Sequence, residues 1–158
     1  MSQTQTITVT INGEDITRRV PVRLNLVDFI RIEAQLTGAH VGCEHGVCGA
    51  CTVEVDGAPV RGCLMLAVQA HGAEVVTIEG LAETGRGAAL RAAFKDNNAL
   101  QCGFCTPGML ASALEYIEGG GAADRMAIRQ HISGNYCRCT GYQSIVDAIC
   151  DVIEGEPS

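Results

Sequence analysis

The residues with the clearest chemical potential are the cysteines, of which this chain of 158 residues has nine. Cysteines at this density serve in disulfides, in zinc sites or as ligands of iron–sulfur clusters. Disulfides need an oxidising compartment. The first residues are polar and uncharged, without the basic and apolar regions of a secretory signal peptide. We therefore expect a cytoplasmic chain whose thiols are reduced and free to bind metal.

Four cysteines of the first half follow the spacing C-x4-C-x2-C, with a fourth after a further eleven residues. They are Cys43, Cys48, Cys51 and Cys63. This spacing is the signature of a plant-type [2Fe–2S] ferredoxin site. Three thiolates from one short segment can meet two irons only if the chain curls tightly, which Gly42, Gly46 and Gly49 permit. Zinc could also bind four cysteines, but the spacing favours iron.

The second half holds a C-x2-C pair and a C-x-C pair. They are Cys102 with Cys105 and Cys137 with Cys139. Each pair precedes a predicted helix start, where partial positive charge and free amides favour thiolates. We expect these four cysteines to converge between the two helix starts and to bind a second [2Fe–2S] cluster. A structural zinc site remains an alternative for these four cysteines. A thioredoxin-like redox role for Cys102 and Cys105 would leave Cys137 and Cys139 without a function.

Two further residues receive no ligand role. A Rieske centre needs two histidine ligands, and His45 has no second Cys–His partner in the sequence. We interpret His45 as a loop residue that shields the first site. The ninth cysteine, Cys150, lies beside Ile149 on the apolar stripe of the last predicted helix, so we expect it to pack in the core.

Alternating apolar residues around the first quartet predict a mixed α/β domain. The predicted strands are 6–11, 16–22, 52–55, 60–63 and 74–78. Asn12-Gly13 and Asp56-Gly57 are hairpin turn signals. A helix over 26–36, capped by Asn25 and ended at Gly38, crosses between the two hairpins. This inventory fits a β-grasp fold.

The second half reads as helical, after a predicted linker at 79–87 in which Gly85 and Gly87 flank Arg86. The predicted helices are 90–94, 106–118, 125–132 and 144–153. Thr106 is the expected cap of the second of these, with Pro107 at its first position, and Asp124 caps the third. We therefore predict an α+β chain: a ferredoxin-like domain at 1–80 and an all-helical four-helix bundle at 81–158.

Composition and motif content exclude several classes of function. The net charge of −7 disfavours nucleic-acid binding. No apolar run is long enough to span a membrane. A G-x-G-x-x-G loop after a strand is missing from the sequence, so any flavin is expected on another chain. Aromatic residues make up only 4% of the chain, and such a thin core benefits from bound metal.

Three stretches carry a resemblance to a known family. They are Gly42-Cys-Glu-His-Gly-Val-Cys-Gly-Ala-Cys-Thr52, Leu100-Gln-Cys-Gly-Phe-Cys-Thr-Pro-Gly-Met109 and Gly134-Asn-Tyr-Cys-Arg-Cys-Thr-Gly-Tyr142. The chain resembles the small iron–sulfur subunit of the molybdenum hydroxylases, which include xanthine dehydrogenases, carbon monoxide dehydrogenase, aldehyde oxidoreductases and N-heterocycle dehydrogenases. The resemblance covers about 6–153 and fills all eight family cysteine positions.

The resemblance implies that the first quartet holds the cluster facing a flavin subunit. It implies that the second quartet holds a buried cluster near a molybdopterin. Gln101 matches the family position that hydrogen-bonds the pterin, and Cys139 lies close to it. From the residues alone, Gln101 reads as a loop amide that bonds nearby backbone.

The implied function is electron transfer from a molybdopterin site on a large subunit to FAD on a medium subunit during oxidation of a small substrate. The implied assembly is a heterotrimer, single or paired, with no catalytic centre on this chain. A free-standing two-cluster ferredoxin and a zinc-stabilised interaction module are the alternatives. Carbon monoxide, aldehydes, purines and other N-heterocycles stay open as substrates, although the first cysteine loop is more similar to organic-substrate members.

Overall fold

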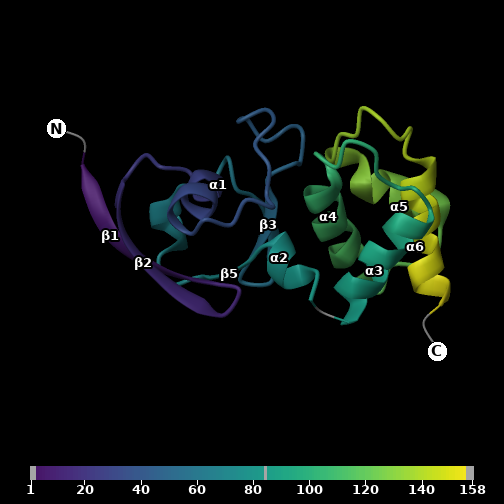
Figure 1. Ribbon diagram of the computed structural model, residues 1–158, viewed down its shortest axis with the longest axis horizontal. Coiled ribbons are helices and arrows are strands. Elements are labelled where there is room, and N and C mark those ends of the chain that lie inside the picture. Colours follow the sequence, from purple (N-terminus) through teal and green to yellow (C-terminus); the bar gives the residue numbers. More distant parts are fainter. Residues whose placement is uncertain (1–2, 84, 156–158) are drawn as a thin grey trace.

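The computed structural model describes residues 3–83 and 85–155, with a five-stranded sheet towards one end and a group of helices at the other (Figure 1). The strand order is β2-β1-β5-β3-β4. The strands are β1 (Thr4–Ile11), β2 (Glu14–Pro21), β3 (Thr52–Val55), β4 (Ala58–Arg61) and β5 (Glu74–Val76). All five predicted strands are confirmed. However, β2 and β4 begin and end earlier than predicted, so that Cys63 lies beyond β4.

Both predicted hairpin turns are present. Asn12 and Gly13 have φ angles of 51° and 84°, and Asp56 and Gly57 have 49° and 79°. Two successive left-handed residues make the tight turn whose twist matches that of paired strands. β1 pairs with β2 and β3 with β4 in antiparallel fashion, and β5 joins the two hairpins by lying parallel to β1.

The helix predicted after β2 is shorter than expected. It consists of α1 (Leu26–Asp28) and a π-helical turn, η1 (Phe29–Glu33). The side chain of Asn25 accepts the Asp28 amide at 2.7 Å, which confirms the predicted cap. The predicted end at Gly38 is wrong, because Gln35 already takes the left-handed conformation, with φ of 59°. The last turn is the wider π-helical turn η1, and the chain leaves the helix after it.

The predicted linker at 79–87 is also wrong in its local structure. Its first residues belong to α2 (Ile78–Leu81) and its last to α3 (Gly85–Asp96), with a turn at 82–83 between them, and position 84 lies outside the described residues. Helix α3 therefore begins five residues before the predicted start at Leu90. Gly85 and Gly87 are poor helix formers. Burial of Gly87, Leu90 and Phe94 against the neighbouring helices outweighs that preference.

The remaining helices are α4 (Thr106–Glu118), α5 (Arg125–His131) and α6 (Gln143–Glu154), with a 3-10 turn, η3 (Ile132–Gly134), after α5. Asp124 caps α5 as predicted, by accepting the amides of Met126 and Ala127 at 2.8 and 3.3 Å. The predicted cap of α4 is wrong. Cys105 occupies the N-cap position, and the hydroxyl of Thr106 is buried without a hydrogen-bond partner.

Two apolar cores hold the fold together. One lies between the sheet and the α1 segment and includes Ile7, Phe29 and Val53. The other lies among α3, α4, α5 and α6 and includes Phe94 and Met109. Helix α4 also packs against β3 and so joins the two halves. Within the described residues, none of the helices has the length and apolarity needed to cross a bilayer.

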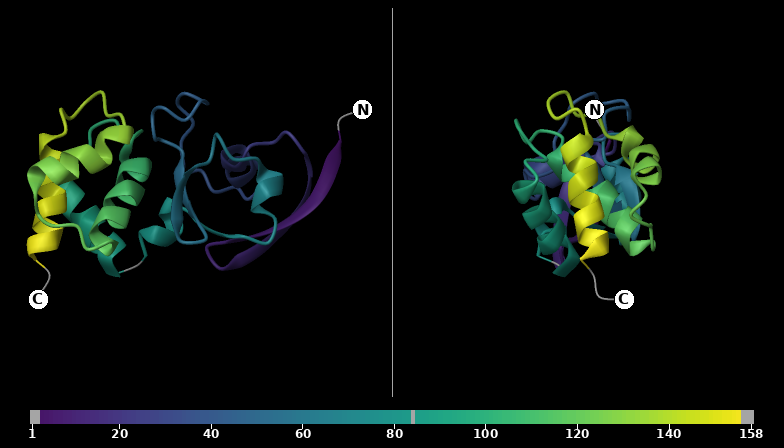
Figure 2. Two further views of the ribbon diagram at one scale, coloured as in Figure 1. Left: turned by 180° about the vertical axis from the view of Figure 1, so that it is seen from behind. Right: turned by 90° about the vertical axis from the view of Figure 1, so that its right-hand side faces the viewer.

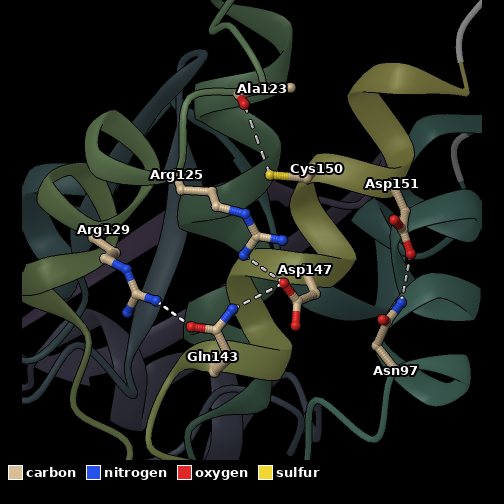
Figure 3. Close-up of polar contacts among 8 residues, drawn as sticks. All are labelled: Asn97, Ala123, Arg125, Arg129, Gln143, Asp147, Cys150 and Asp151. Carbon is tan, nitrogen blue, oxygen red and sulfur yellow. Dashed lines mark hydrogen bonds and ion pairs between the residues drawn. The ribbon is translucent and has the colours of Figure 1, made fainter.

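Polar contacts fix the last two helices to one another (Figure 3). Arg125 forms an ion pair with Asp147 at 2.5 Å. Gln143 donates to Asp147 at 3.0 Å and accepts from Arg129 at 2.5 Å. Cys150 lies on α6, the helix that also carries Gln143 and Asp147, and is only 5% exposed. Its predicted place in the core is confirmed.

Candidate metal centres

The cysteine-rich segments lie on one side of the molecule. The first cysteine loop, residues 42–51, precedes β3, and the second cysteine loop, residues 135–142, precedes α6. Both project from the top of the view in Figure 1, and Figure 2 shows the same arrangement from behind. The remaining cysteines lie at Cys63, just after β4, and at Cys102 and Cys105, just before α4.

The first cysteine loop has the tight curl that its glycines predict. Gly46 has a φ of 80°, a conformation that residues with a Cβ rarely adopt. The curl turns the amides of Val47 and Cys48 toward the sulfur of Cys43, at 3.3 and 3.4 Å. A Cβ on Gly46 would lie 2.4 Å from a methyl carbon of the exposed Leu64 side chain, which would have to move, so the left-handed backbone is the stronger requirement for glycine.

The thiols of the first quartet associate in two pairs with opposite character. Cys43 interacts with Cys48, and Cys51 interacts with Cys63. Hydrogen bonds from the backbone of Cys48 and His45 lower the pKa of the Cys43 thiol to about 6. Burial raises the pKa of the Cys51 thiol to about 11. Cys43 is therefore a thiolate at neutral pH, whereas Cys51 keeps its proton until a cation displaces it.

The second quartet also forms two pairs. The sulfurs of Cys102 and Cys139 are 3.6 Å apart, and Cys105 interacts with Cys137. The hydroxyl and amide of Thr140 donate to the sulfur of Cys137 at 3.1 and 3.4 Å. The two sequence pairs thus contact each other near the starts of α4 and α6, while the binding of one cluster by all four cysteines stays a prediction.

The second quartet repeats the contrast in acidity. Burial would raise the pKa of Cys137, but the hydrogen bonds from Thr140 outweigh burial, and the pKa is lowered. Burial raises the pKa of Cys105 to about 12. Each quartet thus contains one thiol that hydrogen bonds stabilise as a thiolate and one whose pKa is raised by burial.

The second site is open on one side. Cys102 and Cys139 are exposed, while Cys105 and Cys137 are partly buried. We expected a buried cluster at this site. In the chain alone, however, the site is partly exposed. Gln101 is exposed beside the open edge, and its amide donates to the carbonyl of Cys139 at 3.1 Å. This backbone contact is the one expected from the residues alone, and it places Gln101 at the rim of the site.

The pairing of the thiols is compatible with a two-iron cluster. Within residues 3–83 and 85–155, no three His, Cys, Asp or Glu side chains gather around one metal position. A structural zinc ion needs four thiolates around a single point. Two iron atoms that share four cysteines are instead satisfied by two separate pairs. Amide and hydroxyl donors that point at the sulfurs also suit iron–sulfur chemistry.

Some residues at these sites gave no sequence signal. His40 stacks on Phe104 with ring centroids 4.7 Å apart, which connects the first cysteine loop to the Cys102–Cys105 segment. Arg61 contacts both Gly49 of the first cysteine loop and Asn135, the first residue of the second. The positions of Arg61 and Asn135 near cysteines were the only clue, because neither belongs to a metal-ligand pattern. His45 contacts the carbonyl of Cys43 and is exposed.

Comparisons with known proteins agree with this geometry. Residues 9–75 match the family described as "2Fe-2S iron-sulfur cluster binding domain", and residues 77–150 match the "[2Fe-2S] binding domain" family. The chain is 54% identical over 151 residues to caffeine dehydrogenase subunit gamma of Pseudomonas sp. (strain CBB1), covering 92% of this chain and 89% of that one. The chain belongs to the family of small iron–sulfur subunits of the molybdenum hydroxylases.

Two further members of this family extend the comparison. The nicotine 6-hydroxylase small subunit of Paenarthrobacter nicotinovorans is 49% identical over 145 residues, covering 92% of this chain and 87% of the relative. The crystal structure of quinoline 2-oxidoreductase from Pseudomonas putida 86 superposes with a TM-score of 0.91 at 49% identity, covering 98% of this chain and 96% of that one. As a small iron–sulfur subunit, the chain has two [2Fe–2S]-binding domains and serves electron transfer within an oxidoreductase, without a catalytic centre of its own.

Proposed function

We propose that this chain conducts electrons from a molybdopterin-binding large subunit to an FAD-binding medium subunit. The ligand sets are Cys43, Cys48, Cys51 and Cys63 in the first half and Cys102, Cys105, Cys137 and Cys139 in the second. The observation that carries the proposal is the presence of two sets of paired thiols, one in each half, whose loops contact one another. Each [2Fe–2S] cluster, when bound, supplies one-electron redox chemistry.

The protein's own groups hold the thiolates ready for this chemistry. Amides of Val47 and Cys48 stabilise negative charge on Cys43, and Thr140 does the same for Cys137. Hydrogen bonds to sulfur are one of the means by which a protein sets the potential of an iron–sulfur site. The chain thereby binds both clusters and tunes them independently.

The open edge of the second site is the proposed contact with the large subunit. Cys102, Cys139 and Gln101 are all exposed there. Gln101 has further hydrogen-bonding capacity beyond its contact with the Cys139 carbonyl, because a side-chain amide has two donor hydrogens and an acceptor oxygen. We place the pterin against Gln101 and Cys139.

The first site has an apolar rim that suits a second partner. Val47 is 44% exposed, and Leu64, which lies against Gly46, is 63% exposed. Leu66 is 40% exposed nearby in the sequence. Apolar side chains gathered around a functional loop are typical of a protein-binding surface. We assign this rim to the FAD-binding subunit.

The proposed organisation has a β-grasp domain at 1–80 and a four-helix bundle, built from α3, α4, α5 and α6, at 81–158. The separate apolar cores of the two halves support this division. The proposed complex is a heterotrimer, single or paired. We place it in the cytoplasm, since all nine cysteines are free of disulfides.

The substrate is chosen on the large subunit, and we propose an N-heterocycle. The relatives described above are named for their action on caffeine, nicotine and quinoline, which are compounds of this class. The identities of 49–54% to these chains support the assignment.

Purification of the native complex tests the proposed function. A tagged chain should retain a molybdopterin subunit and an FAD subunit, and addition of a substrate of the N-heterocycle class should bleach the flavin and iron–sulfur absorbance. Gln101→Ala should lower the amount of molybdopterin retained or slow the bleaching. Gln130→Ala, on exposed surface of α5, should change neither. Recovery of a stable lone chain would favour a free-standing ferredoxin instead.

A further inference from the structure

The two cysteine loops contact each other directly. The amide of Tyr136 donates to the carbonyl of Cys48 at 2.8 Å. Cys48 belongs to the first quartet, and Tyr136 is bonded to Cys137 of the second. One hydrogen bond therefore connects the backbones of the two candidate sites.

A single guanidinium group holds the residues on both sides of this hydrogen bond. Arg61, at the end of β4, donates to the carbonyl of Gly134 at 2.9 Å and to the side-chain oxygen of Asn135 at 3.1 Å. Its other nitrogen donates to the hydroxyl of Thr52 and approaches the carbonyl of Gly49 at 3.5 Å. Gly49 follows Cys48 in the chain, and Asn135 precedes Tyr136.

The surroundings of Arg61 leave little freedom for adjustment. Asn135 is only 2% exposed, and its side-chain oxygen also accepts from Ser112 of α4 at 3.1 Å. A Cβ on Gly49 would lie 2.7 Å from the carbonyl oxygen of Gly134. The loops thus meet backbone against backbone, and the fork of Arg61 spans the contact. A lysine retains the charge but has no planar fork, so it cannot satisfy both loops together.

We propose that Arg61 is a positioning residue for electron transfer between the two sites. Its guanidinium fixes the first cysteine loop against the second and so maintains the Cys48–Tyr136 hydrogen bond. Arg61 touches neither substrate nor, by this assignment, either cluster, so it acts only through the geometry of the two loops. The inference rests on the proposed function, because it requires a cluster at each site.

The test uses the complete complex with Arg61→Lys and Arg61→Met. Arg19→Met is the matched control, since Arg19 is an exposed arginine of the same sheet with one side-chain hydrogen bond, to Thr4 at 2.9 Å. Two quantities are measured: the magnetic interaction between the two reduced clusters by electron paramagnetic resonance, and the rate at which an electron placed on one cluster equilibrates with the other. Iron content and the positions of the individual signals are measured alongside.

Both Arg61 variants should keep about four irons, as two [2Fe–2S] clusters require, while the magnetic interaction weakens and equilibration slows. Arg19→Met should match the unchanged protein. Unaltered interaction and rate in Arg61→Met would overturn the inference and leave the proposed function intact. Loss of iron from Arg61→Lys would also overturn it, because Arg61 would then act in cluster retention. Failure of the unchanged complex to show two clusters would instead overturn the proposed function.

Discussion

At the scale of single residues, identical cysteines acquire different chemistry from their surroundings. Cys43 and Cys51 are eight residues apart in the sequence and belong to one quartet. Amide donors hold the pKa of the first at about 6, and burial raises the pKa of the second to about 11. Cys43 can therefore bind a metal without first losing a proton, whereas Cys51 cannot.

The two pKa shifts determine how the stability of the metal-free loop depends on pH. The pKa of Cys43 is lower in the folded loop than its ordinary value of 9.0. Its contribution to folding is therefore fully present above pH 9.0 and is lost as the pH falls through about 6. The raised pKa of Cys51 acts in the opposite sense, with a contribution present below pH 9.0 and lost as the pH rises through about 11.

Alkylation of the iron-free chain measures this difference. We expect Cys43 to react with iodoacetamide at neutral pH well before Cys51, with half-maximal reactivity near pH 6. Mass spectrometry of the digested chain reports the reaction at each cysteine. Cys150 provides an internal control, because burial raises its pKa as well. Equal rates for Cys43 and Cys51, each rising only near pH 9.0, would contradict the proposed loop geometry.

At the scale of elements, the start of α4 is fitted closely against the first cysteine loop. A Cβ added to Gly108 would lie 2.1 Å from the carbonyl oxygen of Gly49. The neighbouring atom is backbone and cannot rotate away, so helix and loop must separate to admit a methyl group. The absence of a side chain at Gly108 thus lets the helix approach the loop that carries the first thiols.

Gly108→Ala should therefore destabilise the chain by about 1–3 kcal/mol, the range for overpacking a close contact. Gly85→Ala is the matched control, since a Cβ at this position of α3 meets nothing within 4 Å. The control should leave stability unchanged or raise it by up to about 1 kcal/mol, because alanine favours helix. Urea unfolding followed by circular dichroism gives both values. Equal midpoints for the two variants would argue against the contact.

The elements also show what local sequence can and cannot reveal. Asn12-Gly13 and Asp124 were predicted correctly, since turn and cap chemistry acts within a few residues. The linker at 79–87 was predicted wrongly, because Gly85 and Gly87 favour a loop locally while burial in α3 depends on distant helices. Gly38 has a tertiary role as well: its amide donates to Glu79 at 2.8 Å, and a helix-ending signal could not reveal this contact.

The candidate sites divide in the same way. Cysteine spacing alone predicted which thiols lie near one another in each half, because ligand spacing is a local property of the chain, and the structure places those thiols in contacting pairs. The connection between the halves could not be read from the sequence. Arg61 and Gly134 are 73 residues apart and meet across the interface at which α4 packs against β3 and β4.

At the scale of the whole molecule, two separate cores present two thiol quartets on one side. The side chain of Arg61 and the backbone of Tyr136 join the halves at that side, and α4 joins them beneath it. We therefore predict two clusters with separate ligand sets that share one interface. Loss of one cluster should therefore leave the other in place.

Electron paramagnetic resonance of the reduced complex, with Cys48→Ser and Cys137→Ser compared against the unchanged chain, measures this most directly. The unchanged complex should contain about four irons and about four inorganic sulfides and show two distinct [2Fe–2S] signals. Cys48→Ser should abolish one signal and Cys137→Ser the other, with Cys150→Ser retaining both. Iron-free material with bound zinc, or the loss of both signals in Cys48→Ser alone, would contradict the account.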